Sequence, residues 1–104
     1  MAIIAAADAR EMRRLMPATL AWNGPIYIRL AKGHDPVVTA DDGPFVIGKA
    51  VPARDGDDAL ILVTGVALQV GLAAADVLVR AGFEVCAKAR AAGEVESSSS
   101  SPVN

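Results

Sequence analysis

A chain of 104 residues is long enough for one ordinary domain at most. Its net charge of −2, from 10 basic and 12 acidic residues, gives no basic surface field, so nucleic acid is excluded as an expected partner. The single cysteine, Cys86, excludes an internal disulfide and a cysteine-based metal site. Hydrophobic residues still make up 53% of the chain, so we expect part of the apolar surface to face a partner.

No targeting signal or membrane span is visible. Residues 1–4 lack a basic region, and Asp8 interrupts the apolar stretch that follows. The long apolar run from Ala59 to Ala75 falls below the roughly 20 residues that a bilayer requires. We therefore expect a cytoplasmic protein without a membrane partner.

The N-terminal segment has the pattern of a β-α-β unit. Residues 2–6 form a short apolar run that is typical of a strand. Asp8 and Glu11 have the spacing of a capping box, which predicts a helix over residues 9–22. Residues 26–31 (Ile-Tyr-Ile-Arg-Leu-Ala) form the second predicted strand of this unit.

A loop and a linker follow the second strand. Residues 32–36 lie at its carboxyl end, where α/β sheets usually bind ligands. Residues 37–58 are rich in acidic residues, proline and glycine around one apolar patch, residues 45–47, and we interpret them as a linker with a short strand. The carboxylate pairs Asp41-Asp42 and Asp57-Asp58 lie in turn contexts without a histidine, which favours solvated turn residues over a metal site.

Residues 59–87 have a second β-α-β pattern. The run from Ala59 to Val63 predicts a strand, and Thr64-Gly65 predicts a turn. Residues 66–81 have helical periodicity and end at Gly82, which is expected in the left-handed conformation that closes many helices. Residues 83–87 predict the parallel strand that follows.

The helix over residues 66–81 is apolar on two opposite sides. Its strongly polar residues form one narrow stripe, on which Asp76 and Arg80 have the spacing of an ion pair. One apolar side carries Leu68, Leu72, Ala75 and Val79, and the other carries Ala67, Gly71, Ala74 and Leu78. The two neighbouring strands can cover only one side, so we expect the second to be left bare for a partner.

The pattern weakens after Cys86. Residues 88–96 are weakly helical, and the serine run of residues 97–101 predicts disorder. The expected fold class is α/β, with two incomplete β-α-β units joined by a linker and followed by a disordered C-terminal tail. Because neither unit has enough strands to cover its helix, we interpret the chain as the end of one three-layer domain and the start of a second.

Five short segments occur in a specific order and spacing. They are residues 8–12 (Asp-Ala-Arg-Glu-Met), 23–33 (Asn-Gly-Pro-Ile-Tyr-Ile-Arg-Leu-Ala-Lys-Gly), 45–50 (Phe-Val-Ile-Gly-Lys-Ala), 56–58 (Gly-Asp-Asp) and 62–65 (Leu-Val-Thr-Gly). This order resembles the junction between the pyrimidine-binding and C-terminal domains of transketolase-like, thiamine-diphosphate-dependent enzymes, over roughly residues 2–86. The resemblance assigns residues 1–36 to the pyrimidine-binding domain, 37–58 to the linker, 59–93 to the C-terminal domain and 94–104 to a disordered tail.

The resemblance implies a fragment of an enzyme that transfers a two-carbon ketol unit between sugar phosphates with thiamine diphosphate and Mg²⁺. In that family the catalytic glutamate and the aminopyrimidine pocket lie upstream of the matched segment, and another domain holds the diphosphate and metal. We therefore expect this chain to contain no catalytic, cofactor-binding or metal-binding residue and to be inactive alone. A homo-oligomer or a transketolase-like partner subunit is the implied assembly.

One functional position of the family is implied to survive. A basic residue in the loop after the strand of residues 26–31 lies near the mouth of the active site and, in several family members, contacts the sugar phosphate. Lys32 takes this place, with Arg29 in the strand and His34 just beyond it. The alternative interpretation of these residues is a solvated basic loop.

Two other functions stay open from the sequence. Residues 63–71 resemble the glycine turn of short-chain dehydrogenases, with the strand and helix that a dinucleotide fold requires. Gln69 replaces the middle glycine, however, and the only tyrosine, Tyr27, has no lysine four residues on. The remaining hypothesis is a non-catalytic interaction module.

Overall fold

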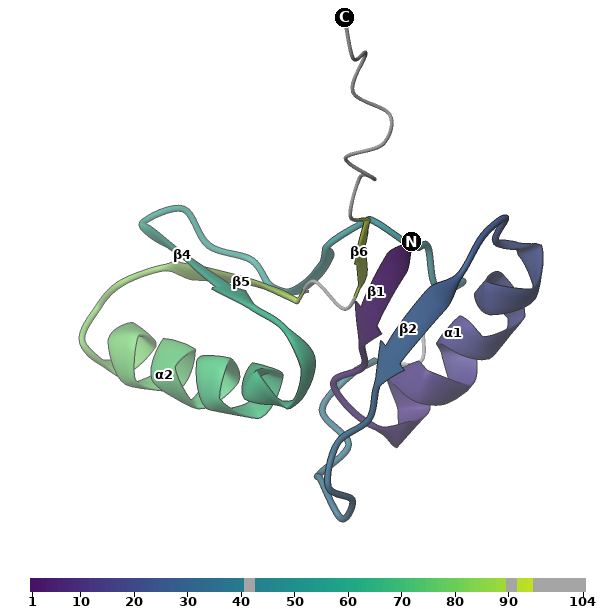
Figure 1. Cartoon of the computed structure of the whole chain (residues 1–104). Coiled ribbons are helices and arrows are strands. Elements are labelled where there is room, and N and C mark those ends of the chain that lie inside the picture. The colour runs from purple at the N-terminus through teal and green to yellow at the C-terminus, as the bar shows by residue number, and fades with distance from the viewer. Residues whose placement is uncertain (41–42, 90–91, 95–104) are drawn as a thin grey trace, which may run out of the picture.

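The computed structural model describes residues 1–40, 43–89 and 92–94. Its elements are, in chain order, β1 (Ala2–Ala5), α1 (Ala9–Ala21), β2 (Ile26–Arg29), β3 (Val51–Arg54), β4 (Ala59–Val63), the 3-10 turn η1 (Gly65–Ala67), α2 (Leu68–Arg80), β5 (Val85–Ala89) and β6 (Ala92–Glu94). Figure 1 shows two units, each with one helix against one face of a small sheet. The predicted α/β class with two β-α-β units is confirmed.

The first unit consists of β1, α1 and β2, with β1 and β2 parallel to each other. α1 covers one face of this sheet, where Ile4, Leu15 and Phe45 form a buried cluster. The opposite face leaves Ile3 and Tyr27 exposed. The sheet of this unit is therefore covered on one side only.

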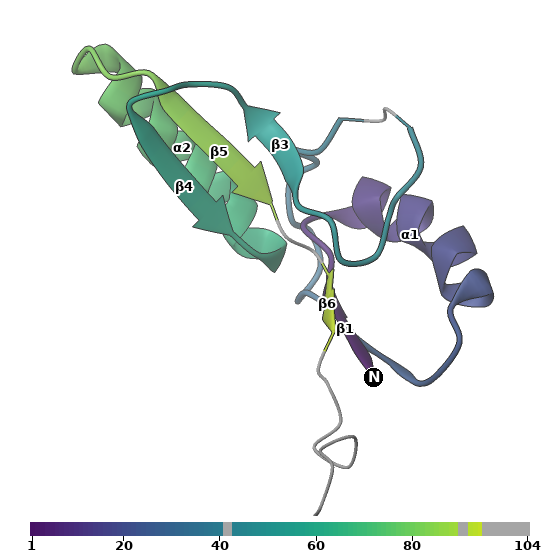
Figure 2. The same cartoon turned by 90° about the horizontal axis from the view of Figure 1, so that it is seen from above.

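The second unit consists of β4, α2 and β5, with β4 and β5 parallel. β3 pairs antiparallel with β5, which gives the order β3-β5-β4 seen in Figure 2. α2 covers one face through Leu68, Gly71 and Ala75, which are buried. The other face leaves Leu60 and Leu62 exposed.

The short strand of the linker segment lies outside its apolar patch. Residues 45–47 form no strand, because Phe45 leaves the surface and packs against Ile4 and Leu15 in the first unit. The strand of this segment is β3, at Val51–Arg54, which finds its partner in β5. The backbone N–H and C=O groups of a strand need hydrogen-bond partners, and in this segment residues 51–54 find them in β5.

The segment after α2 also differs from the prediction. The amide of Phe83 donates to the carbonyl of Leu78 at 3.1 Å and closes the helix around Gly82 (φ +96°), so β5 begins at Val85 rather than at residue 83. Residues 88–96, predicted to be weakly helical, contain the end of β5 and then β6, which runs antiparallel to β1. Of the predicted disordered tail, residues 94–104, Glu94 is the last residue of β6, and residues 95–104 lie outside the described residues, as does the pair Asp41-Asp42.

The sides of α2 are only partly as predicted. Gly71 belongs to the covered side, because a Cβ there would lie 2.6 Å from Cγ1 of Val63. Ala67 and Ala74 are exposed as expected. Asp76 pairs with Arg54 of β3 at 2.5 Å rather than with the predicted Arg80. This exposed ion pair lies on the β3 side of α2. None of the helices in the described residues has the length and apolar content that crossing a bilayer requires.

The start of α1 is capped by two buried carboxylates. Oδ1 of Asp8 accepts a hydrogen bond from the amide of Glu11 at 2.8 Å, as the predicted capping box requires. Glu11 reaches back as well, but its Oε2 accepts from the amide of Ala7 at 2.7 Å instead of from that of Asp8. Asp8 is 6% exposed and Glu11 2%. The cap therefore orders the end of β1 together with the first turn of α1.

Asp8 also holds the linker. Its Oδ2 accepts from the amides of Val38 at 2.8 Å and Thr39 at 2.7 Å, and the Thr39 hydroxyl donates to the same carboxylate at 2.8 Å. Arg10 and Arg14 of α1 donate to backbone carbonyls of the same segment. Beside this network, a second buried cluster joins Ala7 to Leu68 of α2 and Ala89 of β5, with Val38 and Val63 packed against it. These contacts connect the two units.

The two carboxylates differ in pKa. Burial acts to raise the pKa of Asp8, but hydrogen bonds from the amides of Glu11, Thr39 and Val38 and from the Thr39 hydroxyl outweigh it, so this pKa lies below its ordinary value. Burial raises the pKa of Glu11. The Ala7 amide offsets this only in part, and the neighbouring Asp8 charge raises it further.

We expect Asp8→Asn to lower the free energy of unfolding by about 2 kcal/mol, because an amide NH₂ would then face backbone donors that have no other acceptor among the described residues. Glu11→Gln is the matched control. It keeps an acceptor for the Ala7 amide and removes a charge that burial disfavours, so its effect should stay below about 1 kcal/mol. Urea denaturation followed by circular dichroism measures both. Equal losses in the two variants would contradict the role given to Asp8.

The same pair predicts opposite responses to pH. The folded-state pKa of Asp8 is lowered from 3.8, so its contribution to stability is present above that value and is lost as pH falls through the folded pKa. The folded-state pKa of Glu11 is raised from 4.5, so the stability it contributes is present below that value and is lost as pH rises through the folded pKa. Urea midpoints measured across this range should lose their acid-side fall in Asp8→Asn. In Glu11→Gln the urea midpoints should no longer fall as pH rises toward neutral. Loss of the acid-side fall in Glu11→Gln and of the neutral-side fall in Asp8→Asn would refute both pKa directions.

Candidate functional site

A cleft lies between the two units, at the carboxyl ends of β1, β2 and β4. Its volume is about 430 Å³. Three short segments line it: residues 5–6 at the end of β1, residues 29–32 at the end of β2 and residues 64–67 after β4. Ligands of α/β proteins usually bind at such strand ends, so this is the candidate site.

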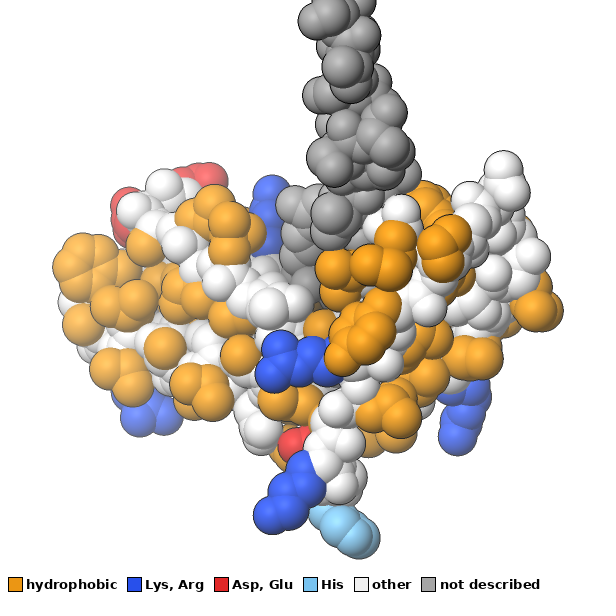
Figure 3. All heavy atoms as spheres, in the orientation of Figure 1, with side chains coloured by type: hydrophobic (Ala, Val, Ile, Leu, Met, Phe, Trp, Pro, Cys, Tyr) orange, Lys and Arg blue, Asp and Glu red, His pale blue; other side chains and the backbone are white. Residues whose placement is uncertain are grey.

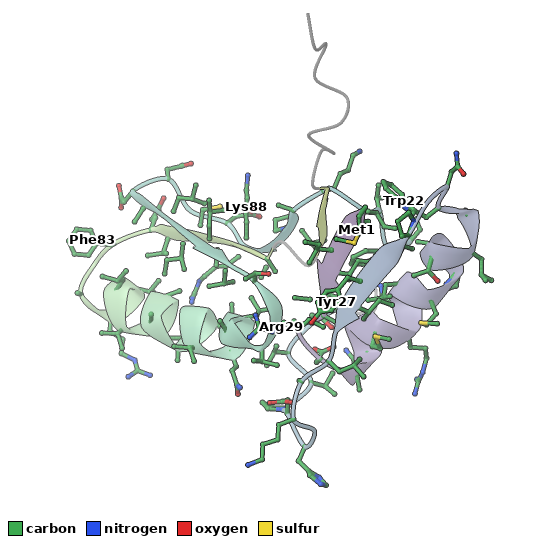
Figure 4. The ribbon with its side chains drawn as sticks, in the orientation of Figure 1. Met1, Trp22, Tyr27, Arg29, Phe83 and Lys88 are labelled. Atoms are coloured by element: carbon green, nitrogen blue, oxygen red, sulfur yellow. The ribbon has the colours of Figure 1, made fainter. Side chains whose placement is uncertain are left out.

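Two of the three basic residues predicted from the sequence line the cleft. Arg29, the last residue of β2, lies between the two units in Figure 4. Lys32 follows in the loop that projects beyond β2 in Figure 1. Both side chains are exposed, and neither forms a hydrogen bond or an ion pair with another described residue. Their charges are therefore available to a ligand.

The third predicted residue, His34, does not line the cleft. It is exposed and has a φ of +61°, directly after Gly33 with a φ of +100°. These two left-handed residues turn the chain sharply at this point of the loop. The structure thus brings Arg29 and Lys32 together at the cleft and leaves His34 outside it.

The turn after β4 is the part of the site that the sequence pattern did not assign. Gly65 is buried with a φ of +59°, and a Cβ on it would lie 3.4 Å from the Cβ of Ala5. Glycine therefore allows this turn to approach the end of β1 closely. η1 and α2 start here without an acidic residue in their first turns. One sequence signal was positional, since Thr64-Gly65 follows β4 as residues 30–36 follow β2. The other was the resemblance of residues 63–71 to a glycine turn that binds dinucleotides.

The electrostatics of the cleft favour an anion. Two cationic side chains line it from the first unit, and the 3-10 turn η1, which leads into α2, lines it from the second. Backbone N–H groups at the start of a helix lack intrahelical partners and carry partial positive charge. A phosphate group has the charge and the acceptor atoms to use both kinds of donor.

The described residues do not fit a metal–diphosphate site. No group of three or more His, Cys, Asp or Glu among them could hold a metal ion. Asp58 acts in a turn, as predicted, because its carboxylate accepts from the amide of Glu84 at 2.8 Å. The neighbouring Gly56 has a backbone role too, since a Cβ there would lie 2.4 Å from the amide nitrogen of Val85. We assign no cofactor chemistry to these residues.

Comparison with known proteins gives consistent relatives, although no model of a known protein family matches the chain. The transketolase family protein y4mN of Sinorhizobium fredii is 40% identical over 83 residues, which cover 79% of this chain and 24% of that protein. The 6-deoxy-6-sulfo-D-fructose transketolase subunit SqwH of a Clostridium species is 36% identical, over 73% of this chain and 24% of that subunit. The 1-deoxy-D-xylulose-5-phosphate synthase of a Synechococcus species is 34% identical, over 79% and 13%.

A solved structure agrees with these relatives. It is described as a split gene transketolase, inactive beta4 tetramer, and it matches 88% of this chain with a TM-score of 0.82 and 28% sequence identity. The chain spans only 30% of that chain and 24% or less of the three relatives. The short-chain-dehydrogenase alternative is not supported by these comparisons. In sequence and in fold, this chain is a transketolase-like segment, as the order of its short motifs predicted.

Proposed function

We propose that the chain forms the substrate-phosphate end of a transketolase-like active site, in an enzyme that transfers a two-carbon ketol unit between sugar phosphates. The observation that supports it is the cleft at the carboxyl ends of β1, β2 and β4, with Arg29 and Lys32 on one side and Thr64 with the 3-10 turn η1 on the other. The phosphate would bind here, and its sugar would extend out of the cleft toward the reacting groups.

The two cations would contribute differently. The guanidinium of Arg29 can bind two phosphate oxygens at once and is held at the end of a strand, so it sets orientation. Lys32 is a point charge on a flexible stem in a loop, so it adds attraction with less geometric selectivity. His34 lies outside the cleft, so of the three residues it has the least support as a phosphate ligand.

We propose the domain organisation that the family resemblance implied. Residues 1–36 would end the pyrimidine-binding domain, residues 37–58 would link the domains and residues 59–93 would begin the C-terminal domain. The separation into two sheets supports this division. One detail modifies it, because β6 returns to β1, so in the fold the second unit ends at Ala89.

Thiamine diphosphate and Mg²⁺ would supply the carbanion chemistry of such an enzyme. Since the described residues offer no metal cluster, we propose that other segments or other subunits hold both groups. Two of the similar proteins are named as a subunit or an assembly, SqwH and the beta4 tetramer. We propose that this chain likewise assembles, with copies of itself or with a transketolase-like partner subunit.

Ribose 5-phosphate titrated into the chain should shift amide NMR signals around residues 29–32 and 64–67 saturably, whereas ribose should not. Arg29→Ala and Lys32→Ala should each weaken binding by about tenfold, the usual loss for a hydrogen bond to a charged group. His34→Ala and the matched control Arg80→Ala, at the far end of α2, should leave the affinity unchanged. Equal binding of ribose, or an equal loss in Arg80→Ala, would refute the phosphate site.

The chain alone should bind no thiamine diphosphate. Calorimetric titration with the cofactor and Mg²⁺ should give only heats of dilution, because the described residues provide no group of metal ligands. Titration with Mg²⁺ alone is the control for ion binding. A micromolar dissociation constant for the cofactor would place its site within this chain and refute the proposal that other segments or subunits hold it.

A further inference from the structure

Residues 5–7 form a thin spacer between the two walls of the cleft. On one side, Ala5 is the partner of Arg29 in the parallel pairing of β1 with β2. On the other side, a Cβ on Gly65 would lie 3.4 Å from the Cβ of Ala5 and 3.8 Å from the carbonyl oxygen of Ala6. Figure 3 shows a basic side chain at the boundary between the units, where Figure 4 labels Arg29. The position of the spacer therefore sets how far the end of β2 lies from η1.

The last residue of the spacer is fixed by a side chain of α1. The amide of Ala7 donates to Oε2 of Glu11 at 2.7 Å. Both residues are buried, so solvent does not compete for this hydrogen bond. The amide of Glu11 is itself held by the carboxylate of Asp8, which caps the helix. A buried acceptor on a capped helix thus holds the end of the spacer in one place.

Ala7 connects this hydrogen bond to the second wall of the cleft. It belongs to the buried cluster that also contains Leu68 and Ala89. Leu68 is the first residue of α2 and directly follows η1, whose residues 65–67 line the cleft. Because protein interiors are closely packed, a shift of Ala7 either moves Leu68 or opens a gap beside it. The hydrogen bond from Ala7 to Glu11 is therefore linked to both walls.

We propose that Glu11 is a positioning residue for the phosphate cleft. Its carboxylate holds the spacer so that Arg29 on one side and the N–H groups of η1 on the other reach the same phosphate. Glu11 does not line the cleft itself, so it acts only through residues 5–7. The inference rests on the proposed phosphate site and assigns a role to a residue behind the wall of that site.

The reach of the Glu11 side chain matters here, whereas its charge does not help. A carboxylate behind the cleft repels a phosphate, and burial already disfavours the ionised form of Glu11. The spacer requires an acceptor at the depth of the Ala7 amide. Glutamine offers such an acceptor at the same reach, whereas aspartate keeps the charge but is shorter by one methylene group. The two substitutions therefore separate positioning from electrostatics.

The test is the affinity of the full chain for ribose 5-phosphate, measured from amide NMR shifts. Glu11→Gln should bind within about twofold of the wild type, whereas Glu11→Met, which has a similar length but no carbonyl acceptor, should bind about fivefold more weakly, as is usual for residues that act on a site without touching its ligand. Glu11→Asp should also weaken binding, although it keeps the charge, because its carboxylate is withdrawn from the Ala7 amide.

A separate measurement of stability distinguishes positioning from a general loss of structure, since removing a buried acceptor also destabilises the fold. Val85→Ala is the matched control. Val85 is buried and pairs with Ala59 at the start of β4, at the end of the sheet opposite the cleft. Its truncation should lower the urea midpoint and leave the affinity unchanged. If Glu11→Met does not fold, Glu11→Asp gives the decisive affinity.

The ligand-free chain provides a second readout. In Glu11→Met the amide signals of residues 64–68 should shift, whereas in Glu11→Gln they should stay in place. Wild-type affinity in both Glu11→Met and Glu11→Asp, or an equal weakening in Glu11→Gln or Val85→Ala, would overturn the role of Glu11 and leave the phosphate site intact. A wild-type chain that does not bind ribose 5-phosphate would overturn the phosphate site, and the role of Glu11 with it.

Discussion

The rest of the structure depends on the carboxylate of Asp8. It accepts the amide of Glu11 at the start of α1 and the amides of Val38 and Thr39 in the linker, so one buried charge fixes two segments that are 30 residues apart. An ionised carboxylate tolerates burial only when several donors replace its hydration. Because the linker leads into the whole second unit, this network positions the turn after β4 relative to the end of β2.

That positioning explains how much of the candidate site the sequence could show. Arg29 and Lys32 could be singled out because they follow a predicted strand, which is a local feature. Thr64 and Gly65 could not be joined to them, since they meet the same cleft only after the two units are placed. His34 was predicted as a site residue by the same local argument, but it lies outside the cleft because the left-handed residues Gly33 and His34 turn the loop.

The features of the fold also differ in whether local sequence or long-range contacts determine them. β4 and the Gly82 helix stop were predictable because strand composition and left-handed caps are properties of a few neighbouring residues. The core position of Phe45 could not be predicted, because its burial depends on Ile4 and Leu15, which are distant in sequence. β6 pairs with β1 across almost the entire chain, and no local pattern encodes such a partner.

Both units leave part of the apolar surplus of the composition exposed. The first unit leaves Ile3 and Tyr27 bare on its open face. The second leaves Leu60 and Leu62 bare on its open face and Val70 and Val77, 67% and 63% exposed, on the outside of α2. At about 25 cal/mol per Å², covering a few hundred Å² contributes several kcal/mol, which is comparable to the net stability of a small domain. The second unit supplies one wall of the cleft, so the geometry of the site is coupled to whatever covers these faces. Assembly and phosphate binding should therefore stabilise each other, because both require the same folded second unit.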